Sequence, residues 1–361
     1  MDKTTISAAE STLPSHPPIE LLEKLSNALA VSGDEGAVRK IVLEEIKPHA
    51  SQVTVDALGN VLAQAGNLDN PKLRVMLAAH MDEVGLMIMD KEEEGIYRFA
   101  TVGGIDARHL VGKPVWIGDE RVPGIIGTRP IHLLQEEDLK RAIPLENLRI
   151  DVGFEKDRVK VGNRAAFATP FQQVGPSLCG KALDDRLGVA ILIELIKHAP
   201  KHIALQAAFT VQEEIHLRGA HTAAYALAPH LAIVIDATPA WDLPTWDGSE
   251  NVRYNTRLDA GPAIYIADEA TLYDPRLIRY LAETAEKHQI PYQYRQPGKG
   301  ATDAGSIHRK RAGIPTVAVS VPIRYPHTPI SVCRLADWQN TFQLLHHALA
   351  EIDPVILQQE R

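Results

Sequence analysis

The sequence contains very little cysteine and has no long apolar run. Cys179 and Cys333 are the two cysteines among 361 residues, so a disulfide framework and a cysteine-based zinc knuckle are both excluded. No apolar run approaches the roughly 18 residues needed to span a bilayer. The first 18 residues are rich in Ser, Thr and Pro and lack the basic and apolar regions of a secretion signal. We therefore expect residues 1–18 to form a flexible tail and the protein to be cytoplasmic.

A strong excess of charge of one sign is missing as well. Lys and Arg number 38 and Asp and Glu number 46, which gives a formal net charge of −8. Such a chain has no overall attraction for nucleic acid or an anionic membrane, and we expect neither as a partner. Hydrophobic residues make up 45% of the chain, enough for a sizeable core. What is unusual is the presence of 15 histidines beside so few cysteines.

Helical periodicity and short apolar runs alternate in the two outer parts of the chain. Apolar residues at helical spacing predict helices over 19–29, 36–46, 185–198, 220–228, 275–288 and 338–352. Short apolar runs predict strands within 53–63 and over 73–79, 204–211, 231–235 and 316–321. This alternation predicts an α/β fold, with helices on both faces of a mixed sheet.

The segment between these two parts has a different pattern. Strand-length apolar runs such as 115–117, 124–126 and 165–167 are separated by Gly, Pro and charged turns, and helical periodicity is scarce apart from the polar stretch 135–141. We predict a small β-rich, barrel-like insert over residues 85–175. It would interrupt one α/β domain that is formed by residues 19–84 and 176–361.

Imidazole and carboxylate groups follow the predicted strands of the α/β part. His80 comes directly after the strand 73–79, and Asp236 comes directly after the strand 231–235. Because ligands bind beyond the carboxyl ends of the strands in an open α/β sheet, we expect these groups to meet at one edge. Taken singly, each is more often a polar cap, a helix N-cap or a solvated group, and only their joint occurrence favours a metal site. The candidates are His80, Asp82, Glu83, Asp184, Asp185, Glu213, Glu214, Asp236 and His327.

The candidate donors have the chemistry of a site for two metal ions. Imidazoles and carboxylates without thiolates suit zinc, cobalt or manganese, and the oxygen-rich balance fits two ions that share a bridging carboxylate. Such a pair can hold a substrate carbonyl and activate a water between the ions. Because Glu213 and Glu214 point in different directions at a strand end, one can bind metal while the other acts as a general base. Asp82 is placed to accept the second ring N–H of His80.

The same residues lie in six motifs that are spread over nearly the whole chain. The motifs are AHMDEVG (79–85), GKALDDR (180–186), TVQEE (210–214), LRGA (217–220), TDAG (302–305) and RYPHTP (324–329). In this order they resemble the tetrahedral aminopeptidase family of dinuclear metallopeptidases, which also includes glutamyl aminopeptidases. Six motifs in the same order are far more specific than any one of them.

The resemblance implies a ligand role for five residues. Asp184 would bridge two divalent metal ions in each subunit, with zinc as the first choice and cobalt or manganese as alternatives. His80 and Asp236 would complete the protein ligands of one ion. Glu214 and His327 would complete those of the other ion.

The resemblance also implies catalytic groups and an assembly. Glu213 would be the general base, and Asp82 would orient His80. The insert would serve dimer formation, and dimers would assemble into a dodecamer, a tetrahedral shell with its active sites facing inward. Substrates would then be short peptides that can enter the shell.

The sequence departs from the family pattern at three positions. His216, Trp241 and Ala301 stand where members often have glycine. His216 and Trp241 are candidate substrate-binding residues. For His216 the alternatives are an exposed loop residue or a contact to a supplementary metal, and for Trp241 the alternative is packing or anchoring of a loop. The departures leave the expected metal ligands intact and bear on the shape of the substrate pocket.

We therefore expect a dinuclear-metal-dependent aminopeptidase that removes the N-terminal residue of short peptides through a metal-bridging water and the base Glu213. A metal-dependent deacylase or amidase acting on small amides is an alternative. A non-catalytic assembly scaffold is disfavoured because every expected ligand is present. Glycosidase activity would require two carboxylates working without metal. The sequence leaves open the preferred N-terminal residue, the native metal, and whether the assembly is a dimer or a dodecamer.

Overall fold

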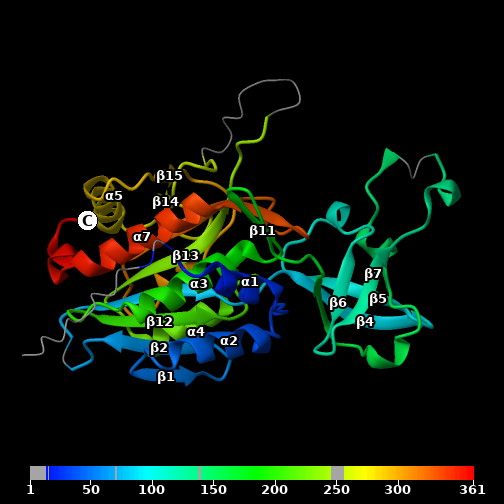
Figure 1. Ribbon diagram of the computed structural model, residues 1–361, viewed down its shortest axis with the longest axis horizontal. Helices are drawn as coiled ribbons and strands as arrows, with labels where there is room; N and C mark the ends of the chain where they lie inside the picture. The colour runs from blue at the N-terminus through cyan, green and yellow to red at the C-terminus, as the bar shows by residue number, and fades with distance from the viewer. Residues whose placement is uncertain (1–13, 15, 70, 137–139, 245–255) are drawn as a thin grey trace, which may run out of the picture.

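The molecule has two parts, a large mixed sheet with helices on both faces and a small closed β-barrel beside it (Figure 1). The computed structural model describes residues 14, 16–69, 71–136, 140–244 and 256–361. Most of the predicted tail and residues 137–139 of the polar stretch 135–141 therefore lie outside the described residues. The architecture confirms the predicted α/β fold with a barrel-like element. None of the described helices is both long and apolar enough to cross a membrane.

The helices and strands have the following bounds. The helices are α1 (Ile19–Asn27), α2 (Gly36–Ile46), α3 (Leu183–Lys197), α4 (Arg218–Leu227), α5 (Pro275–Lys287), α6 (Ala304–Ile307) and α7 (Leu335–Glu351). The strands of the large sheet are β1 (Gln52–Val55), β2 (Val61–Gly66), β3 (Arg74–His80), β10 (Gln172–Val174), β11 (Ser177–Gly180), β12 (Ala204–Thr210), β13 (Leu231–Pro239), β14 (Ala263–Tyr265), β15 (Gln293–Arg295), β16 (Thr316–Arg324) and β17 (Ser331–Arg334). The strands of the barrel are β4 (Gly85–Glu93), β5 (Ile96–Val102), β6 (Pro114–Ile117), β7 (Val122–Gly127), β8 (Arg149–Asp151) and β9 (Arg164–Phe167).

The middle of the large sheet is parallel. Its strand order is β1-β2-β12-β3-β13-β16-β17-β11-β10, with β14 paired to β16 and β15 paired to β14. β3 is parallel to both β12 and β13, and β13 is parallel to β16. β3 is buried from Val75 to His80, as expected for a strand covered by helices on both sides. The carboxyl ends of these four strands therefore lie at one edge of the sheet.

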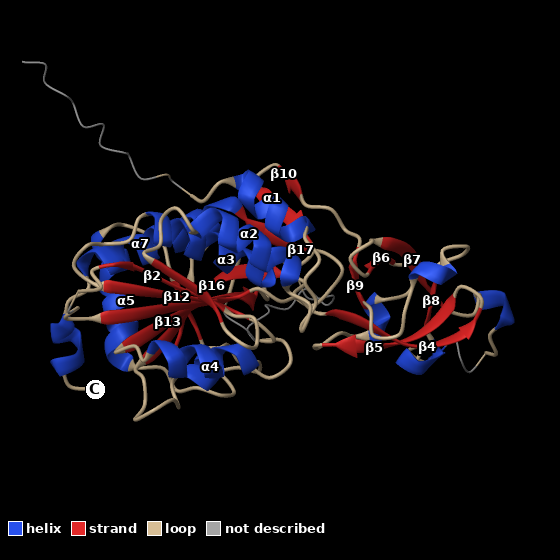
Figure 2. Cartoon of the chain, turned by 90° about the horizontal axis from the view of Figure 1, so that it is seen from below, coloured by secondary structure: helices blue, strands red, loops and turns tan. Residues whose placement is uncertain are grey.

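Helices cover the two faces of this sheet in different ways (Figure 2). One face carries α1, α2, α3 and α7, and the other carries α4. α3 is apolar nearly all round because it packs between the sheet and other helices, and its Leu187 and Ile191 are fully buried. α4 instead presents small side chains, including Ala220 and Ala224, to its face of the sheet. Both arrangements hold the central strands, and so the edge that carries the site, in a close-packed core.

Two predicted strands are longer than expected. The strand predicted over 316–321 is β16, which continues to Arg324. The strand predicted over 231–235 is β13, which continues to Pro239 because Asp236 to Pro239 pair with Ser320 to Ile323 of β16. Asp236 thus lies inside the strand and not after it. Val234 pairs with Ala78 of β3, so Asp236, two residues further on, is level with His80.

The barrel closes in the order β4-β5-β8-β7-β6-β9. Its interior is filled by apolar side chains such as Leu86, Val115, Ile150 and Phe167, each exposed by 2% or less. All six strands come from within the predicted insert 85–175. β10 also falls in that range, but it pairs with β11 in the large sheet. The domain boundaries themselves stay a prediction.

Candidate metal and active site

A cavity of about 600 Å³ lies at the carboxyl edge of the parallel strands. Its lining includes predicted residues from several well-separated segments of the chain. These are His80, Asp184, Glu213, Glu214, His216, Asp236 and His327. The structure therefore brings together every predicted metal ligand and the predicted base.

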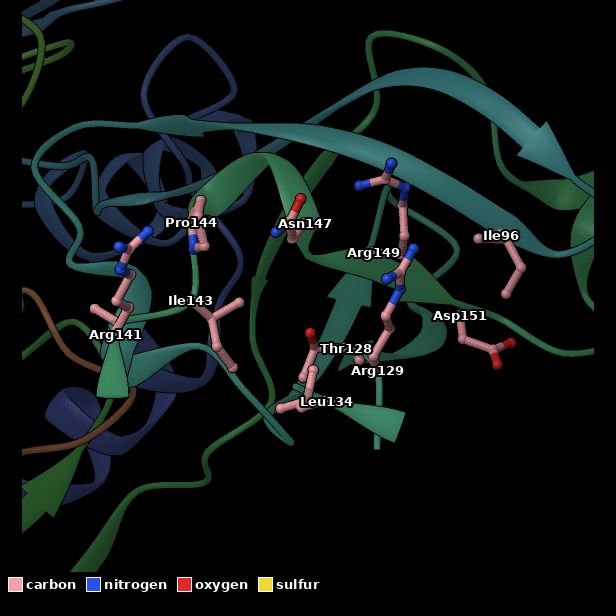
Figure 3. Close-up of a pocket in the computed structure, with 12 residues that line it drawn as sticks. Ile96, Thr128, Arg129, Leu134, Arg141, Ile143, Pro144, Asn147, Arg149 and Asp151 are labelled. Carbon is pink, nitrogen blue, oxygen red and sulfur yellow. The ribbon is translucent and has the colours of Figure 1, made fainter. Parts of the chain in front are cut away.

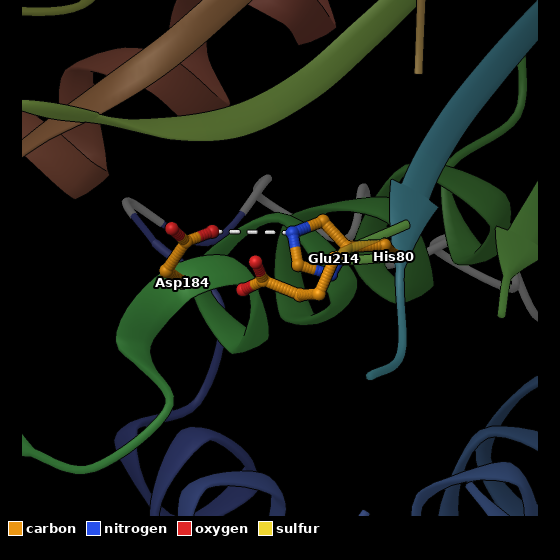
Figure 4. Close-up of side chains that lie close together, drawn as sticks. All are labelled: His80, Asp184 and Glu214. Carbon is orange, nitrogen blue, oxygen red and sulfur yellow. Dashed lines mark hydrogen bonds and ion pairs between the residues drawn. The ribbon is translucent and has the colours of Figure 1, made fainter. Parts of the chain in front are cut away.

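Asp184 lies between the two imidazoles of the site. Its Oδ1 is 3.1 Å from His80 Nε2, and its Oδ2 is 3.5 Å from His327 Nε2. His327 Nε2 is also 3.2 Å from Glu214 Oε2, and His80 Nε2 is 3.9 Å from Asp236 Oδ1. Figure 4 shows the side chains of His80, Asp184 and Glu214 converging. The two oxygens of Asp184 thus face different donor groups, which is the geometry that a bridging carboxylate requires.

Two overlapping groups of donor atoms are compact enough to hold metal ions. Ligand atoms of His80, Asp184 and Glu214 lie within 4.8 Å of one another, and so do those of His80, Asp185 and Asp236. Asp185 is among the candidates from the sequence, although the resemblance implies no ligand role for it. It is fully buried, and its Oδ2 has no hydrogen-bond partner in the described part of the chain. Nitrogen and oxygen donors suit zinc, cobalt and manganese, and an unpartnered buried carboxylate oxygen suits a cation.

Asp82 is completely buried and holds both glutamates and His80. Its Oδ1 accepts a hydrogen bond from the backbone N–H of Glu213 (3.0 Å), and its Oδ2 accepts one from that of Glu214 (3.2 Å). Ser32 donates to Oδ2 as well, at 2.6 Å. His80 Nδ1 is 3.1 Å from the Asp82 carbonyl oxygen and 3.5 Å from Oδ1, so the nearer acceptor is the backbone and not the expected carboxylate. Asp82 therefore fixes the backbone of both glutamates together with the ring of His80.

The barrel part reaches the site through Gly104, in the connection between β5 and β6. The Gly104 carbonyl oxygen lies 3.0 Å from His327 Nδ1. The ring nitrogen that faces away from the carboxylates is thereby held, which fixes the orientation of the imidazole. No sequence motif indicates this contact, because a carbonyl oxygen can come from any residue.

A buried ion network supports the segment that follows β3. Lys181 Nζ lies 2.8 Å from both carboxylate oxygens of Glu83, and Arg186 Nη2 lies 3.2 Å from Glu83 Oε1. All three side chains are at most 3% exposed. Lys181 and Arg186 flank Asp184 in the chain. The network therefore ties the end of β3 to the start of α3, the two segments that supply His80 and Asp184.

The buried carboxylates lie close together, and this shifts the pKa values of the titratable side chains in the site. Burial raises the pKa of Glu213 well above its usual range, against an opposing effect of His80, and the charges of Asp236 and Glu214 raise it further. Burial also raises the pKa of Glu214 to about 7. Burial alone would lower the pKa of His327, but the Glu214 and Asp184 carboxylates raise it to about 9. A cluster of buried negative groups with such shifts is stabilised by bound cations.

The three departures from the family pattern lie in different places. His216 and Ala301 are exposed side chains that line the cavity. His216 has a φ of 81°, in the left-handed region that favours glycine. Trp241 is 43% exposed and is not among the described residues that line the cavity. Its backbone N–H donates to the carbonyl oxygen of Thr256, and a substrate contact of its side chain stays a prediction.

Two charged residues beside the site have no role predicted from the sequence. Asp303 is 2% exposed, its Oδ2 accepts a hydrogen bond of 2.5 Å from Thr210, and its Oδ1 has no partner in the described chain. Thr210 pairs with His80 across β12 and β3, so Asp303 lies directly behind the donor cluster. Arg295, at the end of β15, lines the cavity. Asp303 lies in the TDAG motif, which could have indicated a role for it. Arg295 lies in no motif, so the sequence contained no sign of its place at the cavity.

A second cavity, of about 690 Å³, lies in the barrel part (Figure 3). Its lining includes Arg129, Arg141 and Arg149 and the apolar side chains of Leu134 and Ile143. It contains none of the predicted site residues. The larger of these two cavities is thus not the one that holds the candidate metal site.

The fold and the site together define a class, an α/β protein with a cluster of His, Asp and Glu side chains that could hold metal at the carboxyl edge of its sheet. Residues 59–344 match the family described as M42 glutamyl aminopeptidase. The chain belongs to this family and is a peptidase, a hydrolase of peptide bonds.

This chain is similar to known relatives and solved structures over nearly its whole length. The aminopeptidase APDkam598 of Desulfurococcus kamchatkensis is 34% identical, with a TM-score of 0.88, over 94% of this chain and 96% of that one. The TET1 peptidase of Pyrococcus horikoshii, described as able to assemble into a tetrahedron or a large octahedral shell, is 35% identical, with a TM-score of 0.81, over 92% and 99%. The lysyl aminopeptidase of Pyrococcus furiosus is 30% identical over 93% of this chain and 98% of its own.

Proposed function

We propose that this chain is a metal-dependent aminopeptidase that uses two divalent ions per subunit and Glu213 as its general base. The observation that supports this most strongly is the position of Asp184 between the two imidazoles, at 3.1 Å from His80 and 3.5 Å from His327. His80 and Asp236 would hold one ion, with Asp185 close to the same donors, and Glu214 and His327 would hold the other. Zinc is the first choice, and cobalt or manganese would fit the same ligands.

The chemistry divides between the ions and the side chains. Bound divalent ions would polarise the scissile carbonyl and lower the pKa of an attacking water. Glu213 lines the cavity and, like His327, is absent from both compact donor groups. Its carboxylate would take a proton from that water and pass it to the leaving amine. Asp82 would keep Glu213 in place through the backbone N–H of that residue. Asp82 would thus act by positioning Glu213 and not through proton transfer, whereas His80 would bind metal.

We further propose that subunits associate through the barrel part, as dimers that build a dodecamer. The tetrahedral and octahedral shells described for the Pyrococcus horikoshii peptidase support such an assembly. The barrel part also exposes large apolar side chains, among them Phe154, which is fully exposed, and Val161 at 64%. Exposed apolar groups of this size mark contact surfaces. An assembly of this kind would limit substrates to short peptides, and a cytoplasmic location stays a prediction.

The Glu213→Gln variant tests the assignment of the base. The amide keeps the size of the side chain but cannot accept the proton, so we expect metal content to be retained and kcat to fall by at least about 100-fold. Metal content is measured by elemental analysis, and kcat is measured with aminoacyl-4-nitroanilides. Wild-type activity in this variant would rule out Glu213 as the base.

A substrate panel separates the aminopeptidase from the deacylase. Aminoacyl-4-nitroanilides with a free amine are compared with N-acyl amino acids in the presence of zinc, cobalt or manganese. We expect hydrolysis of the free-amine substrates, and loss of that hydrolysis when a chelator removes the ions. Hydrolysis of N-acyl amino acids alone would contradict the aminopeptidase and support the alternative.

A further inference from the structure

Four of the 15 histidines form a row of half-buried imidazoles in the α/β part. The rings follow one another in the order His198, His346, His347 and His288. His198 and His288 are the first residues after α3 and α5, whereas His346 and His347 are neighbours in α7. Because His198 follows the last turn of α3 and Asp184 lies in the first turn, the row is about 20 Å from the metal site along that helix. The proposed reaction uses none of these imidazoles.

The four rings contact one another as aromatic groups. His288 and His347 are stacked, with ring centres 3.7 Å apart and ring planes 14° apart. The ring centres of His347 and His346 are 5.7 Å apart, and His346 meets His198 edge to face at 6.5 Å. His346 also lies 6.2 Å from the ring of Phe342, which is fully buried. Neutral rings attract one another at such distances, whereas protonated rings repel, so the row packs best when its rings are uncharged.

Only the two outer rings of the row have an acidic partner in the described chain. His288 Nε2 is 2.8 Å from Glu351 Oε1, and His198 Nε2 is 3.9 Å from Glu194 Oε2. The two inner rings, which are the neighbours in α7, form no hydrogen bond or ion pair with a described residue. A proton on an outer ring is therefore compensated by a carboxylate, and a proton on an inner ring is not.

The acids beside the row are already paired with lysines. Two lysines are involved, and each lies 2.8 Å from the carboxylate oxygens of its partners. A further imidazole, that of His202, lies just beyond α7, with its Nε2 3.1 Å from the carbonyl oxygen of Ile352. The negative charge beside the row is thus largely compensated before any imidazole is protonated. The charged groups are Lys197 with Glu45 and Glu194, from α3 and α2, and Lys287 with Glu351, from α5 and α7.

The surroundings keep the inner rings in the uncharged form. Burial and the neighbouring imidazoles lower the pKa of His346 to about 4, from 6.5. Burial and the charge of His288 also lower the pKa of His347, against an opposing effect of Glu351 and together with a smaller effect of Lys287. A histidine whose pKa is lower in the folded chain than in the unfolded chain contributes stability that is fully present above the unfolded pKa. That stability is lost as the pH falls toward the folded pKa.

On this basis we propose that the imidazole row is an acid-sensitive joint between α3, α5 and α7. At neutral pH the uncharged inner rings hold the carboxyl ends of α3 and α5 against α7. As the pH falls below about 6.5, the ordinary pKa of histidine, opening of the joint allows the inner rings to bind protons, and the open state becomes more populated. The joint is a property of the α/β part and does not depend on the proposed peptidase reaction.

The His346→Phe variant tests the joint directly. Phenylalanine keeps an aromatic ring beside Phe342 but cannot bind a proton. Guanidinium-induced unfolding of wild type and variant at pH 7.5 and pH 5.0 gives the equilibrium constant of unfolding at each pH. We expect this constant to rise between pH 7.5 and pH 5.0 at least about tenfold more in the wild type than in the variant, as linkage to a lowered histidine pKa requires. Equal rises in the two proteins would overturn the proposal.

The matched control is His109→Phe, the same substitution at an exposed histidine in the connection between β5 and β6. This variant should show the same acid sensitivity as the wild type, because an exposed imidazole is protonated equally well in the folded and the unfolded chain. Loss of metal ions at low pH affects the three proteins alike and therefore cancels in the comparison. An acid sensitivity reduced as much in His109→Phe as in His346→Phe would contradict the proposal.

Hydrogen exchange of the wild type locates the opening and does not depend on the folding of a variant. After correction for the intrinsic exchange rate at each pH, we expect the amides of 335–351 to lose protection between pH 7.5 and pH 5.0, while those of the barrel strands β4 and β5 keep theirs. In His347→Gln, which removes the other inner imidazole, the loss of protection should be smaller. Equal loss in α7 and in the barrel, or no loss in α7, would contradict an acid-sensitive joint.

Discussion

Several charged groups beside the cavity of the α/β part are buried, whereas ion pairs on the barrel are exposed. His80, Asp82 and Asp236 are at most 5% exposed, and each has hydrogen-bond or ion-pair partners within the fold. On the barrel, Arg158 pairs with Glu120 at 2.8 Å, but both side chains are at least 44% exposed. Burying charge is unfavourable unless partners compensate it, whereas exposed pairs contribute little. The buried charged residues therefore mark the part of the molecule where the fold holds side chains in fixed positions for the proposed reaction.

The largest effect is expected at Asp184. The Asp184→Asn variant loses one of the two charged oxygens that face the imidazoles, so metal affinity and kcat/KM should both fall by more than about 100-fold. Metal titration and aminoacyl-4-nitroanilide assays measure the two quantities. Asp69→Asn, at an exposed aspartate, is the matched control and should behave like the wild type. Retained affinity and activity in Asp184→Asn would show that burial does not mark the working groups.

The next effect is expected in stability, at Lys181. Lys181→Met leaves Glu83 buried with only part of its compensating charge, so the free energy of unfolding should fall by about 3 kcal/mol. Denaturant unfolding measures the change. Lys24→Met makes the same substitution at an exposed lysine that lies 3.3 Å from Glu44 and should change the stability little. Equal losses of stability in the two variants would contradict the expectation that the buried ion pair contributes more than the exposed one.

A smaller effect on activity is expected at Asp82. In Asp82→Asn one carboxylate oxygen is replaced by an amide NH2 group. This group cannot accept a hydrogen bond from the backbone N–H of Glu213 or Glu214. We expect a 10- to 100-fold loss in metal affinity or kcat/KM without loss of the fold, as judged by circular dichroism. Ser32→Ala removes one donor to the same carboxylate and should give a smaller loss. An Asp82→Asn variant with unchanged metal affinity and kcat would remove the positioning role.

The smallest effect is expected on the barrel. Arg158→Met removes the exposed pairs with Glu120 and Glu155, and we expect no measurable change in Tm or in kcat/KM. Thermal unfolding and the same anilide assay measure both. A large change in either quantity would mean that the barrel surface carries more of the stability or of the assembly than its exposure indicates.

Much of the fold follows from patterns that are local in the sequence. The predicted helix over 36–46 is α2 with the same bounds, and the apolar strand predicted over 73–79 is β3, shifted by one residue. The short strands β14 and β15, of three residues each, were not predicted. Their residues have no lasting alternation, and they are strands because they pair with β16 and with each other. Such pairing depends on segments that are distant in the sequence, and the periodicity of a short segment does not reveal it.

The residues of the candidate site also fall into two groups, those that the sequence could predict and those that it could not. The donors His80, Glu213 and Glu214 could be predicted because they follow strands whose carboxyl ends meet at one edge of a parallel sheet. Ser32 and Gly104 could not be predicted, since a hydroxyl or a carbonyl oxygen at a given position is common to many residues. Their contacts to Asp82 and His327 exist because a helical connection and a barrel loop pack against the edge.

The sequence by itself therefore determined the fold class, the family and the set of candidate metal-binding side chains. The physical reason is that strand and helix periodicity and the donor chemistry of His, Asp and Glu are properties of the residues themselves. Only the tertiary structure decided that the two oxygens of Asp184 face different imidazoles, and that Arg295 is buried at the cavity without a carboxylate partner among the described residues. Distances and compensation of charge between distant segments arise from packing, and packing is a property of the whole chain.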